Sequence, residues 1–196
     1  MLAREASMAR QEKGIGMGKI VIINGSPRKH GNTARMIQAF KDSAGANGHE
    51  IVEFNAALSN VGGCHACETC YKTGKACTYD DDFNTIAPDI LDSDGVVLAC
   101  PTYWYSFPGQ IKNVIDKFYS FFIGKKEIAG KKSALICCCE ESELDVMDGL
   151  SQPYDKIIAL LKWESVGKVL ITDVLEEGAV DKTDGCAQAA ALAERF

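Results

Sequence analysis

The segment KIVIINGSPRKHGNTAR, residues 19–35, decides the fold class. It begins with a short, uninterrupted apolar run at residues 19–24 that is rich in β-branched side chains, as expected of a strand buried on both faces. A polar loop follows, and Thr33 opens a helical pattern in which Met36, Ile37 and Phe40 share one face. A buried strand, a polar loop and a helix in succession predict one unit of an α/β protein with a parallel sheet.

The same alternation of strands and helices continues to the end of the chain. Further strands are predicted at residues 50–54, 95–100, 133–139 and 168–174, and helices at 82–91, 109–122, 152–162 and 184–196. Five strands alternating with helices predict a three-layer sandwich whose five-stranded parallel sheet has the order 2-1-3-4-5. In such a sheet a ligand binds beyond the carboxyl ends of strands one and three.

Composition restricts the classes of function. A net charge of −6 argues against nucleic acid as the main partner, and no apolar run is long enough to cross a membrane. Residues 1–17 lack the apolar stretch of a secretory signal, so we expect a mobile extension before one domain at residues 18–196, and a cytoplasmic location. Nine cysteines in a reducing compartment are expected to be thiols, metal ligands or redox groups.

The first loop at the predicted switch point, GSPRKHGNTAR at residues 25–35, has the features of an anion site. It leads from a strand into a helix, where free backbone N–H groups and the helix dipole favour an anion. Candidate side-chain donors are Ser26, Arg28, Asn32 and Thr33. The segment is neither a dinucleotide fingerprint nor a Walker A loop. The alternative is a polar turn that simply begins a helix.

The second loop at this point, PTYWYSFPGQIKNVIDKF at residues 101–118, places Tyr103, Trp104 and Tyr105 next to one another. Core packing would space aromatic side chains at helical or strand intervals. Adjacent aromatics on a loop instead favour a flat aromatic ligand. The alternative is a loop packed against a neighbouring segment or a dimer partner.

A phosphate site beside a flat-ring site describes FMN. The motifs INGSPRKHGNT and ACPTYWYSFPGQIKNVIDKF resemble those of the NADPH-dependent FMN reductase-like family of flavodoxin-like proteins, and the resemblance covers nearly all of residues 19–196. It implies that Ser26, Arg28, Asn32 and Thr33 hold the FMN phosphate. It also implies that the ring is wrapped by Pro101, Thr102, Tyr103, Trp104, Tyr105 and Ser106.

In this family a third loop, after the fourth strand, also meets the flavin, often through small residues. Here that segment reads CCCEESELDVMDG at residues 137–149, which is bulky and acidic. Cys139 and Glu140 are therefore not assigned as flavin contacts from the sequence.

The segment GCHACETCYKTGKAC carries four cysteines with the spacing C-x-x-C-x-x-C-x6-C, at Cys64, Cys67, Cys70 and Cys77. Two short gaps on one loop suit three corners of an iron–sulfur cubane, and the fourth cysteine can complete it. A zinc site more often uses two separated pairs, and bare or redox-active thiols are the remaining alternative. The pattern also resembles the cysteine motif of the iron–sulfur flavoproteins, a branch of the same family, which implies a [4Fe-4S] cluster.

The predicted function is that of an FMN-dependent oxidoreductase, in which NAD(P)H is the co-substrate and electrons pass to a small-molecule or redox-protein acceptor. No catalytic side chain is assigned, because the cofactor carries the chemistry. The rivals are a non-catalytic electron carrier that serves ferredoxin-like partners, and a scaffold with structural zinc. The helix at residues 109–122 is strongly apolar, more so than one sheet face would cover, so we expect a homo-oligomer, either a dimer or a tetramer.

Overall fold

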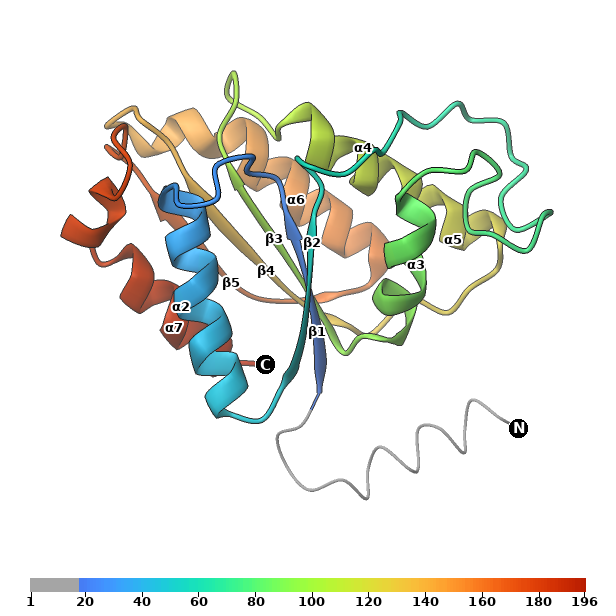
Figure 1. The fold of residues 1–196 in the computed structure, drawn as a ribbon, viewed down its shortest axis with the longest axis horizontal. Helices are drawn as coiled ribbons and strands as arrows, with labels where there is room; N and C mark the ends of the chain where they lie inside the picture. The colour runs from blue at the N-terminus through green and yellow to red at the C-terminus, as the bar shows by residue number, and fades with distance from the viewer. Residues whose placement is uncertain (1–17) are drawn as a thin grey trace.

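Strand β1 (Lys19–Asn24) lies inside a five-stranded parallel sheet in the order β2-β1-β3-β4-β5 (Figure 1). The computed structural model describes residues 18–196. The other strands are β2 (Glu50–Asn55), β3 (Gly95–Pro101), β4 (Lys132–Cys138) and β5 (Glu164–Ile171). The predicted flavodoxin-like fold and strand order are thus confirmed. The predicted extension at residues 1–17 lies outside the described residues.

Helices cover both faces of the sheet (Figure 1). One face carries α2 (Asn32–Ala46) and α7 (Gly185–Ala193). The other face carries α3 (Phe83–Asp92), α4 (Gly109–Lys117), α5 (Tyr119–Ile123) and α6 (Asp148–Leu161), and two 3₁₀ turns complete the chain, η1 (Leu144–Met147) and η2 (Ala179–Lys182). No helix among residues 18–196 is both long and apolar enough to cross a bilayer.

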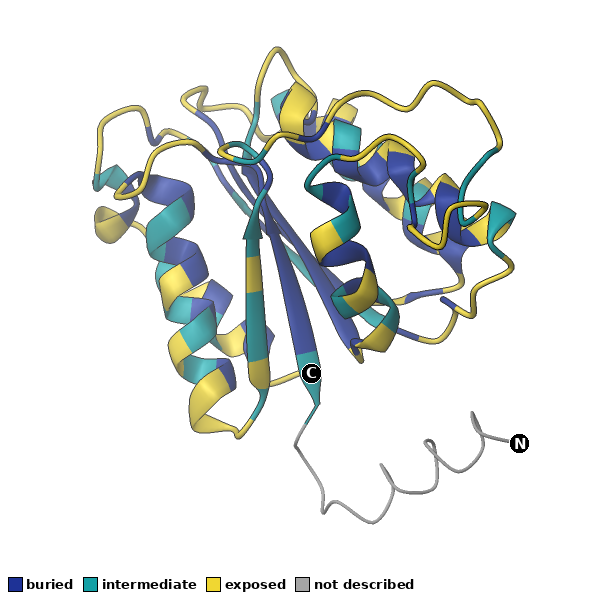
Figure 2. Cartoon of the chain, turned by 45° about the vertical axis from the view of Figure 1, so that its right-hand side comes forward, coloured by how far each residue is buried: buried dark blue, intermediate teal, exposed yellow. Residues whose placement is uncertain are grey.

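The alternation of side chains along β1 explains why both faces need cover. Val21 and Ile23 point into the core beneath α3 to α6, whereas Ile20 and Ile22 point into the core beneath α2 and α7. All four are buried, so the sequence shows a continuous apolar run rather than alternation. The central strands β1, β3 and β4 are buried, and Figure 2 shows the loops beyond the carboxyl ends of the strands largely exposed. These loops are where a ligand can bind.

The predicted elements differ from the observed ones mainly in three places. Helix α6 begins at Asp148, before its predicted start at residue 152. Strand β5 begins at Glu164, earlier than predicted, because the residues before Lys168 pair with β4 across a register shift at Ser133 and Ala134. The predicted helix at residues 109–122 is two helices, since α4 ends at Lys117 and α5 begins at Tyr119.

The apolar face of these two helices is covered by the chain itself. Its members Ile111, Val114, Ile115, Phe118 and Phe121 are all buried in the core, and only Phe122, 45% exposed, lies largely outside it. Residues of α3 and of the cysteine loop (residues 63–77) belong to the same core, so this apolar face needs no partner chain to cover it. A homo-oligomer remains a prediction, and the apolar face of α4 and α5 does not support it.

Candidate functional site

A cleft of about 570 Å³ opens at the carboxyl edge of the sheet, a size typical of small-molecule sites. It is built by the loops that follow β1, β3, β4 and β5. The predicted residues that line it are Ser26, Arg28, Asn32, Thr33, Pro101, Thr102, Tyr103, Trp104 and Tyr105. The predicted residue Ser106 does not line it.

The loop between β1 and α2 leaves the N-terminus of the helix open. The backbone N–H of Ser26 donates to Asn24 Oδ1 at 2.8 Å, and the N–H of Arg28 donates to Ser26 Oγ at 3.3 Å, so the loop is shaped from within. Helix α2 follows Gly31, with no side chain capping its first turn and no acidic residue within it. The first N–H groups are therefore left for a ligand, and the helix dipole favours an anion there.

Asn32 is placed differently from the prediction. Its Nδ2 donates to the carbonyl oxygens of Val174 at 3.1 Å and Glu176 at 3.0 Å, and its Oδ1 accepts from the N–H of Val180 at 3.2 Å. The amide is thus occupied in joining the start of α2 to the loop after β5. Asn32 shapes the cleft wall and offers the ligand its backbone rather than its side chain.

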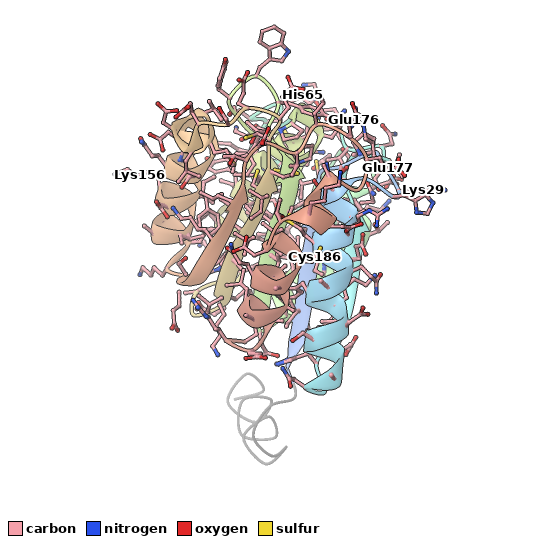
Figure 3. The ribbon with its side chains drawn as sticks, turned by 90° about the vertical axis from the view of Figure 1, so that its left-hand side faces the viewer. Lys29, His65, Lys156, Glu176, Glu177 and Cys186 are labelled. Atoms are coloured by element: carbon pink, nitrogen blue, oxygen red, sulfur yellow. The ribbon has the colours of Figure 1, made fainter. Side chains whose placement is uncertain are left out.

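Cations and acids surround this end of the cleft. Among the cleft-lining residues of the described chain, Arg28 is the only cation. Its neighbour Lys29 does not line the cleft, and Figure 3 shows Lys29, Glu176 and Glu177 at the same end of the molecule. Glu176 and Glu177 do not line the cleft either, although the carbonyl oxygen of Glu176 accepts from Asn32.

The aromatic loop forms the opposite wall and projects into solvent. Tyr103 is 41% exposed, Trp104 95% and Tyr105 56%. Trp104 and Tyr105 both have positive φ angles, 47° and 63°, which side-chain-bearing residues rarely adopt. Such strain is found preferentially at functional sites.

Ser106 and Gly149 hold this strained loop in place. The backbones of Ser106 and Tyr103 bond each other twice at 3.0 Å, which closes the loop, and Ser106 Oγ donates to the carbonyl oxygen of Gly149. A Cβ at Gly149 would lie 2.2 Å from the carbonyl oxygen of Tyr105, so this position requires glycine. Ser106 therefore supports the cleft wall without lining it.

The third loop brings thiols and acids to the cleft. Cys138, Cys139, Glu140 and Glu141 all line it, including the two residues that the sequence left unassigned. Burial raises the pKa of Cys138 to about 12, and burial also raises the pKa of Cys139, so both thiols are protonated at neutral pH. The cleft therefore has one end formed by a cation and backbone amides and one side lined by carboxylates.

Further lining residues were not foreseen in the sequence: Gly31, Val146, Val174 and Leu175. The signal for the last two was available, because the carboxyl end of β5 must lie at the same edge as those of β1, β3 and β4. Because the fifth strand was predicted to end at residue 174 rather than at Ile171, the loop after it was not recognised as part of the site.

The four predicted metal ligands lie around one hollow in the structure. Cys64, Cys67, Cys70 and Cys77 line one small hollow beside α5, away from the cleft. The first two are exposed and the last two half-buried. As placed, no three Cys, His, Asp or Glu side chains among residues 18–196 are close enough together to hold a single metal ion.

The donor set of four thiols is the one that an iron–sulfur cluster requires. A hydrogen bond from the Thr69 hydroxyl lowers the pKa of Cys67, whereas burial and the neighbouring thiolates raise that of Cys70. The backbone has positive φ at Ala66, Glu68 and Tyr71, as in loops that turn N–H groups inward around iron–sulfur sites. Buried Ser120 lines the hollow too, and its hydroxyl has no hydrogen-bond partner among residues 18–196.

Comparison with known families and sequences places the chain beside flavin reductases. A family model described as NADPH-dependent FMN reductase matches residues 18–149. Curated relatives include an iron–sulfur flavoprotein of Methanosarcina thermophila, 33% identical over 113 residues that make up 58% of each protein. Another, from Archaeoglobus fulgidus, is 32% identical over 103 residues, 53% of this chain and 46% of that one. The chain thus spans about half the length of the curated relatives it matches. The predicted likeness to both the family and its iron–sulfur branch is confirmed.

Solved structures show the same fold at low sequence identity. An NAD(P)H:quinone oxidoreductase from Methanothermobacter marburgensis superposes with a TM-score of 0.71 over 90% of this chain and 94% of that one, at 13% identity. An FMN-dependent NADH-azoreductase from Bacillus anthracis, solved in complex with FMN, gives 0.66 over 90% and 98%, at 16% identity.

Proposed function

The chain belongs to the NADPH-dependent FMN reductase family, and we propose that it is an FMN-dependent oxidoreductase that takes hydride from NAD(P)H and passes the electrons to an acceptor. The observation that carries this proposal is the cleft at the carboxyl edge of the sheet. An uncapped helix N-terminus forms one end of it and an exposed aromatic loop forms one wall. These are the two features that a phosphorylated flat ring requires.

At the phosphate end, the chain supplies donors in a fixed arrangement. The N–H groups at the start of α2 point outward, the hydroxyls of Ser26 and Thr33 lie in the lining, and Arg28 adds a planar cation suited to a phosphate dianion. Asn32 keeps this end rigid through its bonds to the loop after β5. Together these groups select a monophosphate and orient the rest of the ligand toward the aromatic loop.

At the ring end, the chain holds one face and leaves space for a second flat molecule. The loop from Pro101 to Tyr105 lines the wall, and its shape is fixed by Ser106 and Gly149. The exposure of Trp104 leaves it free to stack with a nicotinamide or an aromatic acceptor. Stacking there would bring the two flat rings within transfer distance without help from a general acid or base.

Bound FMN supplies both hydride acceptance and one-electron transfer. The residues near it tune this chemistry by charge. Arg28 stabilises negative charge at the phosphate end, whereas Glu140 and Glu141 disfavour additional negative charge in the cleft. The acidic third loop is therefore expected to make reduction harder than in a relative with small neutral residues there.

The cysteine loop is the second redox element of the proposal. Thiolates of Cys64, Cys67, Cys70 and Cys77 would hold a [4Fe-4S] cluster, which supplies one-electron storage. The support is that all four line one hollow, in a chain similar to iron–sulfur flavoproteins. Redox partners beyond this, whether small molecules or proteins, would bind at the exposed rim of either site.

The test combines cofactor identity with turnover. Protein purified and reconstituted without oxygen should release FMN on heating, contain about four irons per chain, and oxidise NADH or NADPH when an acceptor such as a quinone is present. Release of FAD or the lack of any bound flavin would refute the proposal. Bound FMN with negligible NAD(P)H oxidation but rapid reduction by ferredoxin would favour an electron carrier, and a colourless protein that contains zinc would favour the scaffold.

A further inference from the structure

Lys117 is a buried ammonium at the bottom of the cysteine hollow. It ends α4, it is only 3% exposed, and it lines the hollow together with the four cysteines. A charge taken out of water destabilises the fold by several kcal/mol unless it is paired and hydrogen-bonded. The groups that pair with Lys117 therefore indicate the role of its positive charge.

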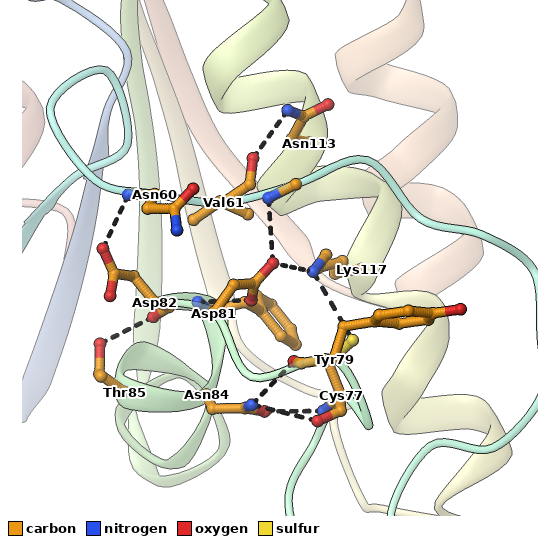
Figure 4. A network of polar contacts seen from close by, with 12 residues as sticks. Asn60, Val61, Cys77, Tyr79, Asp81, Asp82, Asn84, Thr85, Asn113 and Lys117 are labelled. Carbon is orange, nitrogen blue, oxygen red and sulfur yellow. Dashed lines mark hydrogen bonds and ion pairs between the residues drawn. The ribbon is translucent and has the colours of Figure 1, made fainter.

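The first partner, Asp81, fastens the cysteine loop to α4 (Figure 4). Lys117 Nζ donates to Asp81 Oδ2, and the same carboxylate accepts the backbone N–H groups of Gly62 at 3.0 Å and Phe83 at 3.1 Å. Residues 62 and 83 flank the cysteine segment, so one ion pair holds both of its ends. This part of the network is structural, and an uncharged hydrogen-bonding pair could perform it.

The contact of Lys117 with its second partner, Cys77, is not needed to hold the cysteine loop on α4. Lys117 Nζ also lies 3.6 Å from Cys77 Sγ, with geometry suited to N–H···S donation (Figure 4). A neutral thiol is a weak acceptor, whereas a thiolate bound to a metal centre accepts a charge-assisted hydrogen bond. Because Lys117 is buried, solvent screens this interaction far less than that of a surface lysine.

Other cations of the loop do not share this position. Lys75 pairs with Asp80 at 2.8 Å, and both side chains are more than half exposed. Lys75 precedes Cys77 by two residues, yet it does not line the hollow. Lys75 is therefore a matched control, because its positive charge is close to Cys77 in the sequence but is exposed to solvent.

Resting on the iron–sulfur assignment of this loop, we propose that Lys117 is a positioning residue that sets the reduction potential of the centre through Cys77. When the centre gains one electron from a reductant, its total charge becomes more negative by one, with no bond formed or broken. A buried ammonium that donates to one of its sulfurs stabilises this reduced state more than the oxidised one. The potential is therefore higher than it would be without Lys117.

The test is an anaerobic redox titration of the full chain reconstituted with iron and sulfide, with dithionite as reductant and the reduced centre followed by electron paramagnetic resonance. We expect Lys117→Met to shift the midpoint potential of the centre to a more negative value, with Lys117→Arg near the wild-type value. Lys75→Met should leave the potential unchanged. Bound FMN and the iron content of each variant are measured in parallel, so that a change of potential is not confused with loss of the centre.

A buried Asp81 without its partner could prevent folding, so the double variant Lys117→Met, Asp81→Asn is included. It removes both charges and keeps one amide oxygen, which can accept from either Gly62 or Phe83. A negative shift in this variant supports the proposal. An unchanged potential in either variant, at wild-type iron content, overturns the role of Lys117 and leaves the iron–sulfur assignment intact. Failure of the wild-type chain to bind iron overturns both, while the flavin part of the proposed function would stand on its FMN content.

Discussion

At the scale of the residue, Arg28 and Lys29 are neighbours in the sequence with different positions. Arg28 lines the cleft beside the open start of α2, whereas Lys29 does not. We expect Arg28→Ala to weaken FMN binding on the order of tenfold, since one charge-assisted hydrogen bond contributes ~1.5–3 kcal/mol and solvent screens part of it here. Flavin fluorescence quenching gives the dissociation constant. Lys29→Ala is the control, and equal losses in the two variants would show that only general positive charge matters.

The thiols of the cysteine loop differ in acidity although they share one hollow. The Thr69 hydroxyl donates to Cys67 and lowers its pKa, whereas burial raises the pKa of Cys70. Only the thiolate reacts with iodoacetamide, so in metal-free protein the alkylation of Cys67 should reach half its maximal rate at a lower pH than that of Cys70. Mass spectrometry of the labelled peptides reports both rates.

Thr69→Val should raise the half-maximal pH of Cys67, because it removes the donor and keeps the shape of the side chain. Thr73→Val, in the same loop, should leave it where it is. If Cys67 and Cys70 gave the same pH profile in the wild-type protein, the assigned contact with Thr69 would be wrong.

At the scale of the element, the cysteine loop is a unit docked on α5 and its following turn. Tyr71 packs so closely on Gly124 that a Cβ there would lie 2.2 Å from the ring, and Lys126 Nζ lies 4.5 Å from the ring centroid. The loop joins β2 to α3 and shares no lining residue with the cleft. The two sites are therefore expected to respond separately to mutation.

Gly124→Ala should undock the cysteine loop and leave the cleft unchanged. The expected result is faster trypsin cleavage after Lys72 or Lys75, with reduced iron uptake and an unaltered FMN dissociation constant. Gly45→Ala in α2 is the control, since nothing lies within 4 Å of a Cβ there and alanine suits a helix better than glycine. A parallel loss of FMN affinity in Gly124→Ala would show that the loop and the cleft are coupled.

At the scale of the whole molecule, one group of exposed apolar side chains lies at the cleft, whereas the apolar face of α4 is buried. Trp104 and Tyr105 project from one loop, and Leu175, also on the cleft rim, is 57% exposed. A monomer rarely leaves such a cluster in water, so we predict a homodimer whose interface borders the aromatic loop and leaves the cleft open to a second flat molecule. Light scattering should give twice the chain mass of 21.2 kDa, and Trp104→Asp should shift the equilibrium to monomer. A monomer mass for the wild-type protein at working concentration would contradict this.

Much of the molecule follows from the sequence by itself, because the signals concerned are local. The β-branched run of β1 and the apolar spacing of α2 show each element without reference to others. The order of strands follows from their alternation with helices, and the switch point then assigns the two loops. Residues such as Arg28 and Trp104 could therefore be placed at the cleft from their neighbours in the chain alone.

The tertiary structure decided what depends on segments that meet only after folding. The amide of Asn32 is used by a loop 142 residues away, and Lys117 reaches Cys77 from 40 residues along the chain. Nothing in the spacing around either residue encodes these contacts, because they arise from which helix packs against which loop. Likewise, the apolar face of α4 and α5 signals burial in the sequence, but only the fold shows that the chain covers it itself. Periodicity reports that a side chain leaves water, and packing determines which atoms replace the water.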